Sequence, residues 1–109
     1  MIAPGLRGKV VVVTGGVSGI GRATALRFGE EACRVAVWDH VEPDDDLVRD
    51  VSAHGGDCQC FHVDVTSVPA VRAAAVAVVE RFGRIDILIN NAGITRDTLL
   101  VKWKDGDLL

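Results

Sequence analysis

The hydrophobic positions of this chain fall into short continuous runs, and longer segments with helical spacing separate these runs. Four apolar runs have the length of buried strands, and we expect strands at residues 9–14, 34–39, 58–64 and 85–90. Between them the spacing predicts helices at 19–31, 43–53 and 68–82, and a short amphipathic helix at 97–104. Strict alternation of strand and helix predicts an α/β fold with a parallel sheet and right-handed crossovers.

A glycine-rich segment follows the first apolar run, Val10–Val13, and precedes the first helical segment. It reads T-G-x-x-x-G-x-G, with its glycines at Gly15, Gly19 and Gly21. Glycines let the chain turn sharply and let backbone N–H groups approach a pyrophosphate, which the positive end of the helix dipole also attracts. An ordinary glycine-rich turn is the alternative. The context of strand, turn and helix favours nucleotide binding, and the predicted contacts in the turn are Gly15, Val17, Ser18, Gly19, Ile20 and Gly21.

These elements predict a truncated Rossmann-type, doubly wound parallel sheet of about four strands, with three helices and a short C-terminal helical tail. For four strands the expected order is 3-2-1-4, and the direction of winding reverses between the first and fourth strands, where ligands bind. The first two helices are expected on one face and the third on the other. With 109 residues, the chain is expected to be one dinucleotide-binding half-domain, residues 1–109.

An acidic residue marks the end of the second predicted strand. Asp39 lies 18 residues after Gly21, where a carboxylate accepts hydrogen bonds from the adenosine ribose of NAD and would repel a 2′-phosphate. The alternative is an ordinary solvated acid at a strand end. We expect NAD rather than NADP, and we include the neighbouring His40 in the site without giving it a chemical role.

The glycine pattern, together with Asn90-Asn91-Ala92-Gly93, resembles the short-chain dehydrogenase/reductase family. The segment Asn90 to Leu100, NNAGITRDTLL, is similar to reductases of the 3-oxoacyl-carrier-protein type. The resemblance covers about residues 6–100 and only the N-terminal part of that family, whose members are much longer.

The resemblance implies further cofactor contacts near the ends of the third and fourth strands. It implies that Asp64 meets the adenine amino group and that the Val65 backbone borders the ring. It also implies that the segment Asn90, Asn91, Ala92 and Gly93 lines the adenosine ribose and joins the central strands. Ile94 would lie nearest the middle of the cofactor. Asp64 could equally cap the next turn, and Asn side chains can satisfy stray backbone groups without any ligand.

The catalytic residues of this family have no counterpart in the sequence. The resemblance implies a Tyr general acid, a Lys shortly after it and a Ser, but this chain contains no Tyr and none of its lysines stands in a Y-x-x-x-K motif. The serines, Ser18, Ser52 and Ser67, all precede the fourth strand. We therefore assign no catalytic residue.

No metal site is expected either. Cys58, Cys60, His62 and Asp64 share one face of a strand, but same-face neighbours lie about 6.5–7 Å apart, which is awkward for several ligands of one ion.

Three functions remain open from the sequence. The chain is an NAD(H)-binding module without dehydrogenase chemistry, or a fragment or short form of an NAD-dependent oxidoreductase that needs missing or partner residues, or a structural module with a vestigial nucleotide site. Whether it is an enzyme is left open.

Charge and hydropathy limit which classes of binding partner and which cellular compartment we expect. The net charge of −3 and the pI of about 5.5 do not favour nucleic acid. The longest apolar run, Ala73 to Val79, is too short to span a bilayer. The start of the chain lacks the apolar region of a signal peptide, so we expect a cytoplasmic location. Much apolar surface would be left on helix 68–82, strand 85–90 and the C-terminal tail, which predicts a homodimer built on them.

Overall fold

A parallel sheet forms the centre of the protein. The computed structural model describes residues 5–92, 103–104 and 107–108. Four strands, β1 (Val10–Thr14), β2 (Arg34–Asp39), β3 (Asp57–His62) and β4 (Ile87–Asn90), form one sheet. Their order is β3-β2-β1-β4 and every pairing is parallel. The predicted order and the reversal between β1 and β4 are confirmed.

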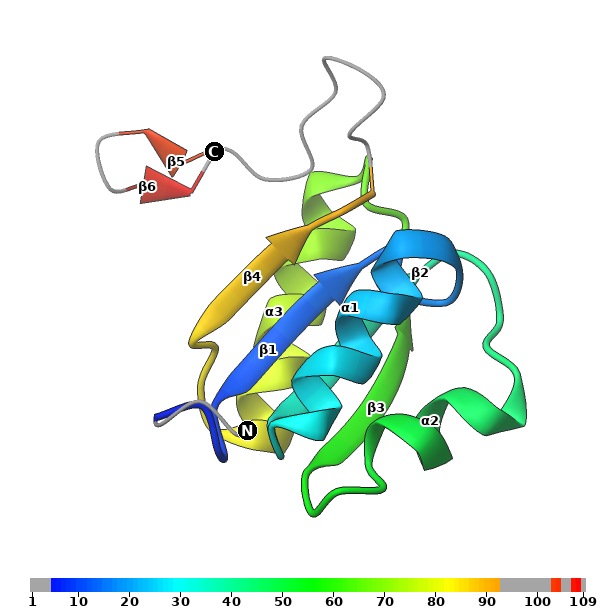
Figure 1. The fold of residues 1–109 in the computed structure, drawn as a ribbon. Helices are drawn as coiled ribbons and strands as arrows, with labels where there is room; N and C mark the ends of the chain where they lie inside the picture. Colours follow the sequence, from blue (N-terminus) through cyan, green and yellow to red (C-terminus); the bar gives the residue numbers. More distant parts are fainter. Residues whose placement is uncertain (1–4, 93–102, 105–106, 109) are drawn as a thin grey trace.

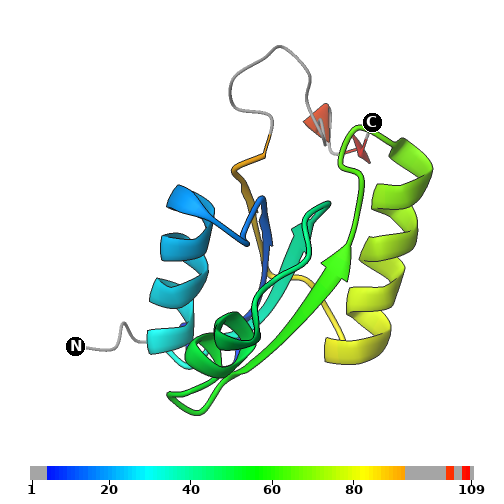
Figure 2. The same cartoon turned by 90° about the vertical axis from the view of Figure 1, so that its right-hand side faces the viewer.

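Helices cover both faces of this sheet. The helices are α1 (Gly19–Glu30), α2 (Asp45–Val51) and α3 (Val68–Phe82). Figure 1 shows the strands running side by side, and Figure 2, seen along the sheet, shows α1 and α2 on one side and α3 on the other. The predicted placement of the helices is therefore confirmed.

The apolar run Val10–Val13 is fully buried because β1 is central and both faces are covered. Val10 and Val12 pack in the cluster that includes α3 residues, whereas Val11 and Val13 pack in the cluster under α1 and α2. This alternation follows from the two-residue period of a strand. It places the last residue of β1, Thr14, at the carboxyl edge of the sheet beside the glycine turn.

Caps set the helix limits. The side chain of Ser67 accepts a hydrogen bond from the N–H of Ala70 at the start of α3, and Gly83 ends that helix with a left-handed φ of 93°. Helix α2 is shorter than the predicted 43–53, because the N-cap is Asp44, whose carboxylate accepts from the N–H of Leu47. Pro43 therefore precedes the helix instead of lying in its first turn.

The sequence prediction for the C-terminal tail is wrong where the structure describes it. Trp103–Lys104 form a strand, β5, paired antiparallel with β6 (Asp107–Leu108), and they do not belong to a helix. An amphipathic pattern of this length does not distinguish a helix turn from a short hairpin. The rest of the predicted tail helix, residues 97–102, lies outside the described residues.

Candidate nucleotide-binding site

The glycine turn connects β1 to α1 through two residues with left-handed backbone. Gly15 has φ +65° and Gly19 has φ +59°, conformations that residues with a Cβ rarely adopt. Gly21 serves a different purpose, because a Cβ there would collide with the carbonyl oxygen of Gly15. All three glycines of the motif are thus required by the turn itself. The absence of a Cβ at Gly21 lets the backbone at Gly15 pass close to the first turn of α1.

The start of α1 presents unused polar groups. Ser18 is the N-cap residue, yet its side chain makes no capping hydrogen bond. Ser18 and Gly19 are exposed, and the side chain of Ile20 is 72% exposed. The first N–H groups of a helix lack partners within the helix and carry its positive dipole end. This end of α1 can therefore hold an anion.

Asp39 lies across the turn at the end of β2 and is 9% exposed. Its carboxylate accepts two backbone hydrogen bonds, from Val17 N–H to Oδ2 and from Val41 N–H to Oδ1, both at 3.1 Å. Nδ1 of His40 lies 3.4 Å from Oδ1. Each carboxylate oxygen has two acceptor positions. Asp39 thus fixes the turn and the following loop, and it keeps acceptor capacity for a ligand hydroxyl.

Residues after β4 form the opposite side of the site. The buried Thr14 accepts hydrogen bonds at Oγ1 from the N–H groups of Asn91 and Ala92, each at 3.0 Å. Asn91 Nδ2 donates to the carbonyl of Gly15 at 3.2 Å. These bonds join the segment after β4 to the end of β1.

These segments surround one hollow of about 460 Å³ at the switch point between β1 and β4. It is lined by Gly15, Ser18, Gly19, Ile20, Trp38, Asp39, His40, Val41, Val65, Asn91 and Ala92. Most of the predicted cofactor contacts are therefore brought together in one place. None of the lining residues is Lys or Arg.

Five predicted contacts remain: three have other positions, and two lie outside the described residues. Val17 lines an adjoining hollow of about 310 Å³, and Gly21 is buried beneath the turn. Asp64 is exposed and accepts hydrogen bonds from the N–H and Oγ1 of Thr66, which lower the pKa of its carboxyl group. Asp64 therefore caps the turn before α3. Gly93 and Ile94 lie outside the described residues.

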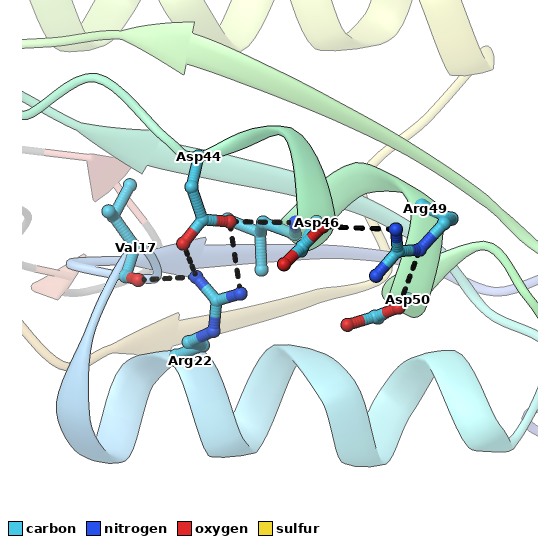
Figure 3. Close-up of polar contacts among 7 residues, drawn as sticks. Val17, Arg22, Asp44, Asp46, Arg49 and Asp50 are labelled. Carbon is cyan, nitrogen blue, oxygen red and sulfur yellow. Dashed lines mark hydrogen bonds and ion pairs between the residues drawn. The ribbon is translucent and has the colours of Figure 1, made fainter.

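The structure adds residues that the motif did not single out. Trp38 and Val41 line the hollow beside Asp39. Arg22 and Asp44 form an ion pair behind the glycine turn (Figure 3). Trp38 could have been identified from its place immediately before Asp39. No sequence signal connects Arg22 with Asp44, which lie 22 residues apart.

The adjoining hollow shares Asp39 and Val41 with the nucleotide hollow and contains Cys60. The hydrogen bond between the thiols of Cys58 and Cys60 lowers the pKa of Cys60 and raises that of Cys58. Cys33, Cys58 and Cys60 are all free thiols. Within residues 5–92 and the short tail strands, no three His, Cys, Asp or Glu side chains are grouped as metal ligands would be.

Comparison with known proteins identifies close relatives. The family model for short chain dehydrogenases matches residues 9–108. A 3-oxoacyl-acyl-carrier-protein reductase (FabG) of Thermotoga maritima is 42% identical over 103 residues, which are 94% of this chain and 42% of the relative. Zerumbone synthase of Zingiber zerumbet is 44% identical over 98 residues, 87% of this chain and 36% of that enzyme.

Solved structures agree with this comparison. The NADH-dependent reductase A1-R′, crystallised with NAD, superposes with a TM-score of 0.76 at 40% identity, over 81% of this chain and 37% of that one. The chain thus spans about 40% of the length of the curated relatives it matches. A family model that matches nearly the whole chain, on a sheet of the same order, is decisive: this protein belongs to the short-chain dehydrogenase family.

Proposed function

We propose that this chain binds NAD(H), mainly through the adenosine and pyrophosphate half of the cofactor. One observation carries the proposal: Asp39 and the exposed start of α1 line the same hollow at the switch point of the sheet. The carboxylate is suited to ribose hydroxyls, and the helix N-terminus is suited to phosphates. The similarity to a reductase crystallised with NAD supports this choice of ligand.

The same charges favour NAD(H) over NADP(H). A 2′-phosphate on the adenosine ribose would come close to Asp39, and no Lys or Arg among the residues lining the hollow would offset the repulsion. The loop after β2 adds an acid, Glu42, and the start of α2 adds Asp44, Asp45 and Asp46. At 4 Å, two like charges repel by about 1–4 kcal/mol, depending on the local dielectric.

Binding without dehydrogenase chemistry is part of the proposal. The 109 residues contain no Tyr, so the described site has no phenol to donate a proton during carbonyl reduction. A fragment or short form of an oxidoreductase is the second candidate, and the 42% identity to a 3-oxoacyl-acyl-carrier-protein reductase favours it. The third is a structural module that has lost nucleotide affinity.

Calorimetric titration of the full chain with NADH, NADPH, AMP and nicotinamide mononucleotide tests the proposal. We expect NADH and AMP to bind with similar affinity, because both contain the adenosine phosphate that the hollow accommodates. NADPH should bind more weakly. Nicotinamide mononucleotide serves as the matched ligand control, and we expect no detectable binding of it. Equal binding of the two mononucleotides would contradict the assignment, and no binding of any ligand would favour a structural module.

Assembly as a homodimer is a further part of the proposal. Helix α3 buries Val71, Ala74, Val78 and Phe82 against the sheet and leaves Val76 and Val79 57% and 45% exposed. In the described sheet, β4 pairs only with β1, and Ile85 just before it is exposed. Apolar surface next to an open strand edge favours association of two copies. The C-terminal tail, also predicted to take part, lies mostly outside the described residues.

The location is likewise proposed as cytoplasmic. Three free cysteine thiols favour a reducing compartment. Separately, none of the helices in the described part of the chain has the length and hydropathy to cross a bilayer.

A further inference from the structure

Arg22 connects the glycine turn to the start of the second helix. It is the first residue after the last glycine of the motif and is half-buried. Its Nη1 donates to the carbonyl oxygen of Val17 at 3.1 Å and to Oδ2 of Asp44 at 3.2 Å, while Nη2 donates to Oδ1 of Asp44 at 3.1 Å (Figure 3). A planar guanidinium can hold a carboxylate with two parallel bonds and still donate to a third acceptor.

Asp44 is itself fixed, because it is the N-cap residue of α2 and accepts from the N–H of Leu47 at 3.1 Å. The acceptor that orients Arg22 is thus attached to a helix rather than to a free loop. The hydrogen bond from Arg22 is the main reason that the pKa of the Asp44 carboxyl is lowered. The Asp44 carboxylate therefore stays ionised at neutral pH.

The residue held by this arrangement is Val17, in the middle of the turn. Its N–H donates to Asp39 Oδ2 and its carbonyl accepts from Arg22, so both of its backbone polar groups are fixed by side chains. The peptide bond that joins Val17 to Ser18 is trans, because the described residues contain no cis bond. In a trans planar peptide the N–H points opposite to the C=O. The Ser18 N–H is therefore directed away from Arg22.

Ser18 lies on the side of the turn that faces the nucleotide hollow. Ser18, Gly19 and Ile20 line that hollow, whereas Arg22 and Asp44 do not. The structure gives the Ser18 N–H no acceptor among the described residues. Arg22 cannot contact a ligand in the hollow with the donors that Val17 and Asp44 already occupy.

We propose that Arg22 is a positioning residue, which aims the Ser18 N–H at a phosphate of the bound nucleotide by holding the Val17 carbonyl. Asp44 neutralises and orients Arg22 for this task. This inference rests on the proposed nucleotide binding and extends it to a residue outside the hollow. It predicts that loss of Arg22 weakens binding of phosphate-bearing ligands and spares binding of the nucleoside.

The experiment compares Arg22→Gln with Arg49→Gln in calorimetric titrations with adenosine, ADP and NADH. Arg49 is a matched control, because it also forms ion pairs with two acids of α2, Asp46 and Asp50, but does not touch the turn. For Arg22→Gln we expect about a tenfold loss of affinity for ADP and NADH. This corresponds to weakening, but not removing, the charge-assisted hydrogen bond from the Ser18 N–H to the phosphate. Adenosine affinity should stay within about twofold, and Arg49→Gln should change none of the three affinities.

Two further variants separate positioning from general stability. Arg22→Lys keeps the charge but lacks the planar fork that bonds both Val17 and Asp44 in the wild type. Its affinity for ADP and NADH should therefore lie between that of the wild type and that of Arg22→Gln. Asp44→Ser keeps an N-cap for α2 and removes the ion pair, and we expect a smaller loss than for Arg22→Gln. In the ligand-free protein, the Ser18 amide resonance should shift in Arg22→Gln and stay in place in Arg49→Gln.

Each contrary outcome has a distinct meaning. If the wild-type chain binds none of the three ligands, both the proposed function and this inference are overturned. If it binds them and Arg22→Gln behaves like Arg49→Gln, only this inference fails. Equal losses for adenosine and ADP would show that Arg22 merely stabilises the fold near the site, which also overturns the positioning role.

Discussion

Replacing Asp39 by Ala should destabilise the fold as well as change the cofactor preference. In the wild type the carboxylate accepts from the N–H groups of Val17 and Val41, both at 3.1 Å, and is almost fully buried. Alanine leaves both donors without this acceptor. A hydrogen bond to a charged group contributes about 1.5–3 kcal/mol, and water can replace part of it because Val41 is exposed.

We therefore expect the free energy of unfolding to fall by about 2–4 kcal/mol, a large part of the total for a small domain. Urea denaturation followed by circular dichroism measures this directly. With a slope of about 1–2 kcal/mol per molar, the midpoint should fall by roughly 1–4 M. Under conditions where the variant is folded, titration with NADH and NADPH should show that the preference for NADH has become much smaller.

Glu42→Gln provides the charge-matched control, since Glu42 is an exposed acid of the loop that follows Asp39. It should leave the urea midpoint within about 0.5 M of wild type, because surface substitutions have small effects. An Asp39→Ala chain as stable as Glu42→Gln would refute the structural role of the carboxylate. A wild-type chain that binds NADPH as well as NADH would refute its role in selecting the cofactor.

Three other outcomes are expected. Cys60 should be alkylated by iodoacetamide faster than Cys58 or Cys33, because its pKa is lowered by the hydrogen bond with Cys58 while those of Cys58 and Cys33 are raised. Peptide mass spectrometry at several pH values checks this, and the Cys60 rate should rise at a lower pH than the rates of Cys58 and Cys33. The double variant Val76→Asp, Val79→Asp should sediment as a folded monomer if α3 forms the dimer contact; an unchanged dimer would exclude that face. The homogeneous chain should not oxidise NADH in the presence of acetoacetyl esters, as followed at 340 nm, because it contains no Tyr; steady substrate-dependent turnover would point to groups shared between chains.

The strands and their order could be predicted because burial on both faces leaves a continuous apolar run such as Val10–Val13. The position of the site followed from topology, since the carboxyl ends of β1 and β4 meet where the winding reverses. The limits of α2 were harder to predict. Pro43 and Asp44 are both good residues for a helix start, and only the contact of Asp44 with Leu47 and Arg22 decides between them.

The hydrogen bonds of Arg22 with Val17 and Asp44 could not be predicted from the sequence. Arg22 comes before β2 in the sequence and Asp44 comes after it. Whether their side chains meet depends on how α1 and α2 pack against each other. A basic residue after a glycine motif is also compatible with direct phosphate binding. The structure favours a different role, because the donors of Arg22 are directed at Val17 and Asp44, outside the nucleotide hollow.

The acids at the strand ends show why a structural and a functional interpretation need not exclude each other. Asp64 caps its own turn through Thr66, which satisfies the structural alternative and leaves contact with adenine as a prediction. Asp39 fixes two backbone N–H groups and also lines the hollow. A carboxylate already held by the backbone loses little side-chain freedom when a ribose binds, so preorganisation favours the ligand. The bonds that stabilise the turn therefore also prepare it for the cofactor, and a substitution at Asp39 cannot change one property without the other.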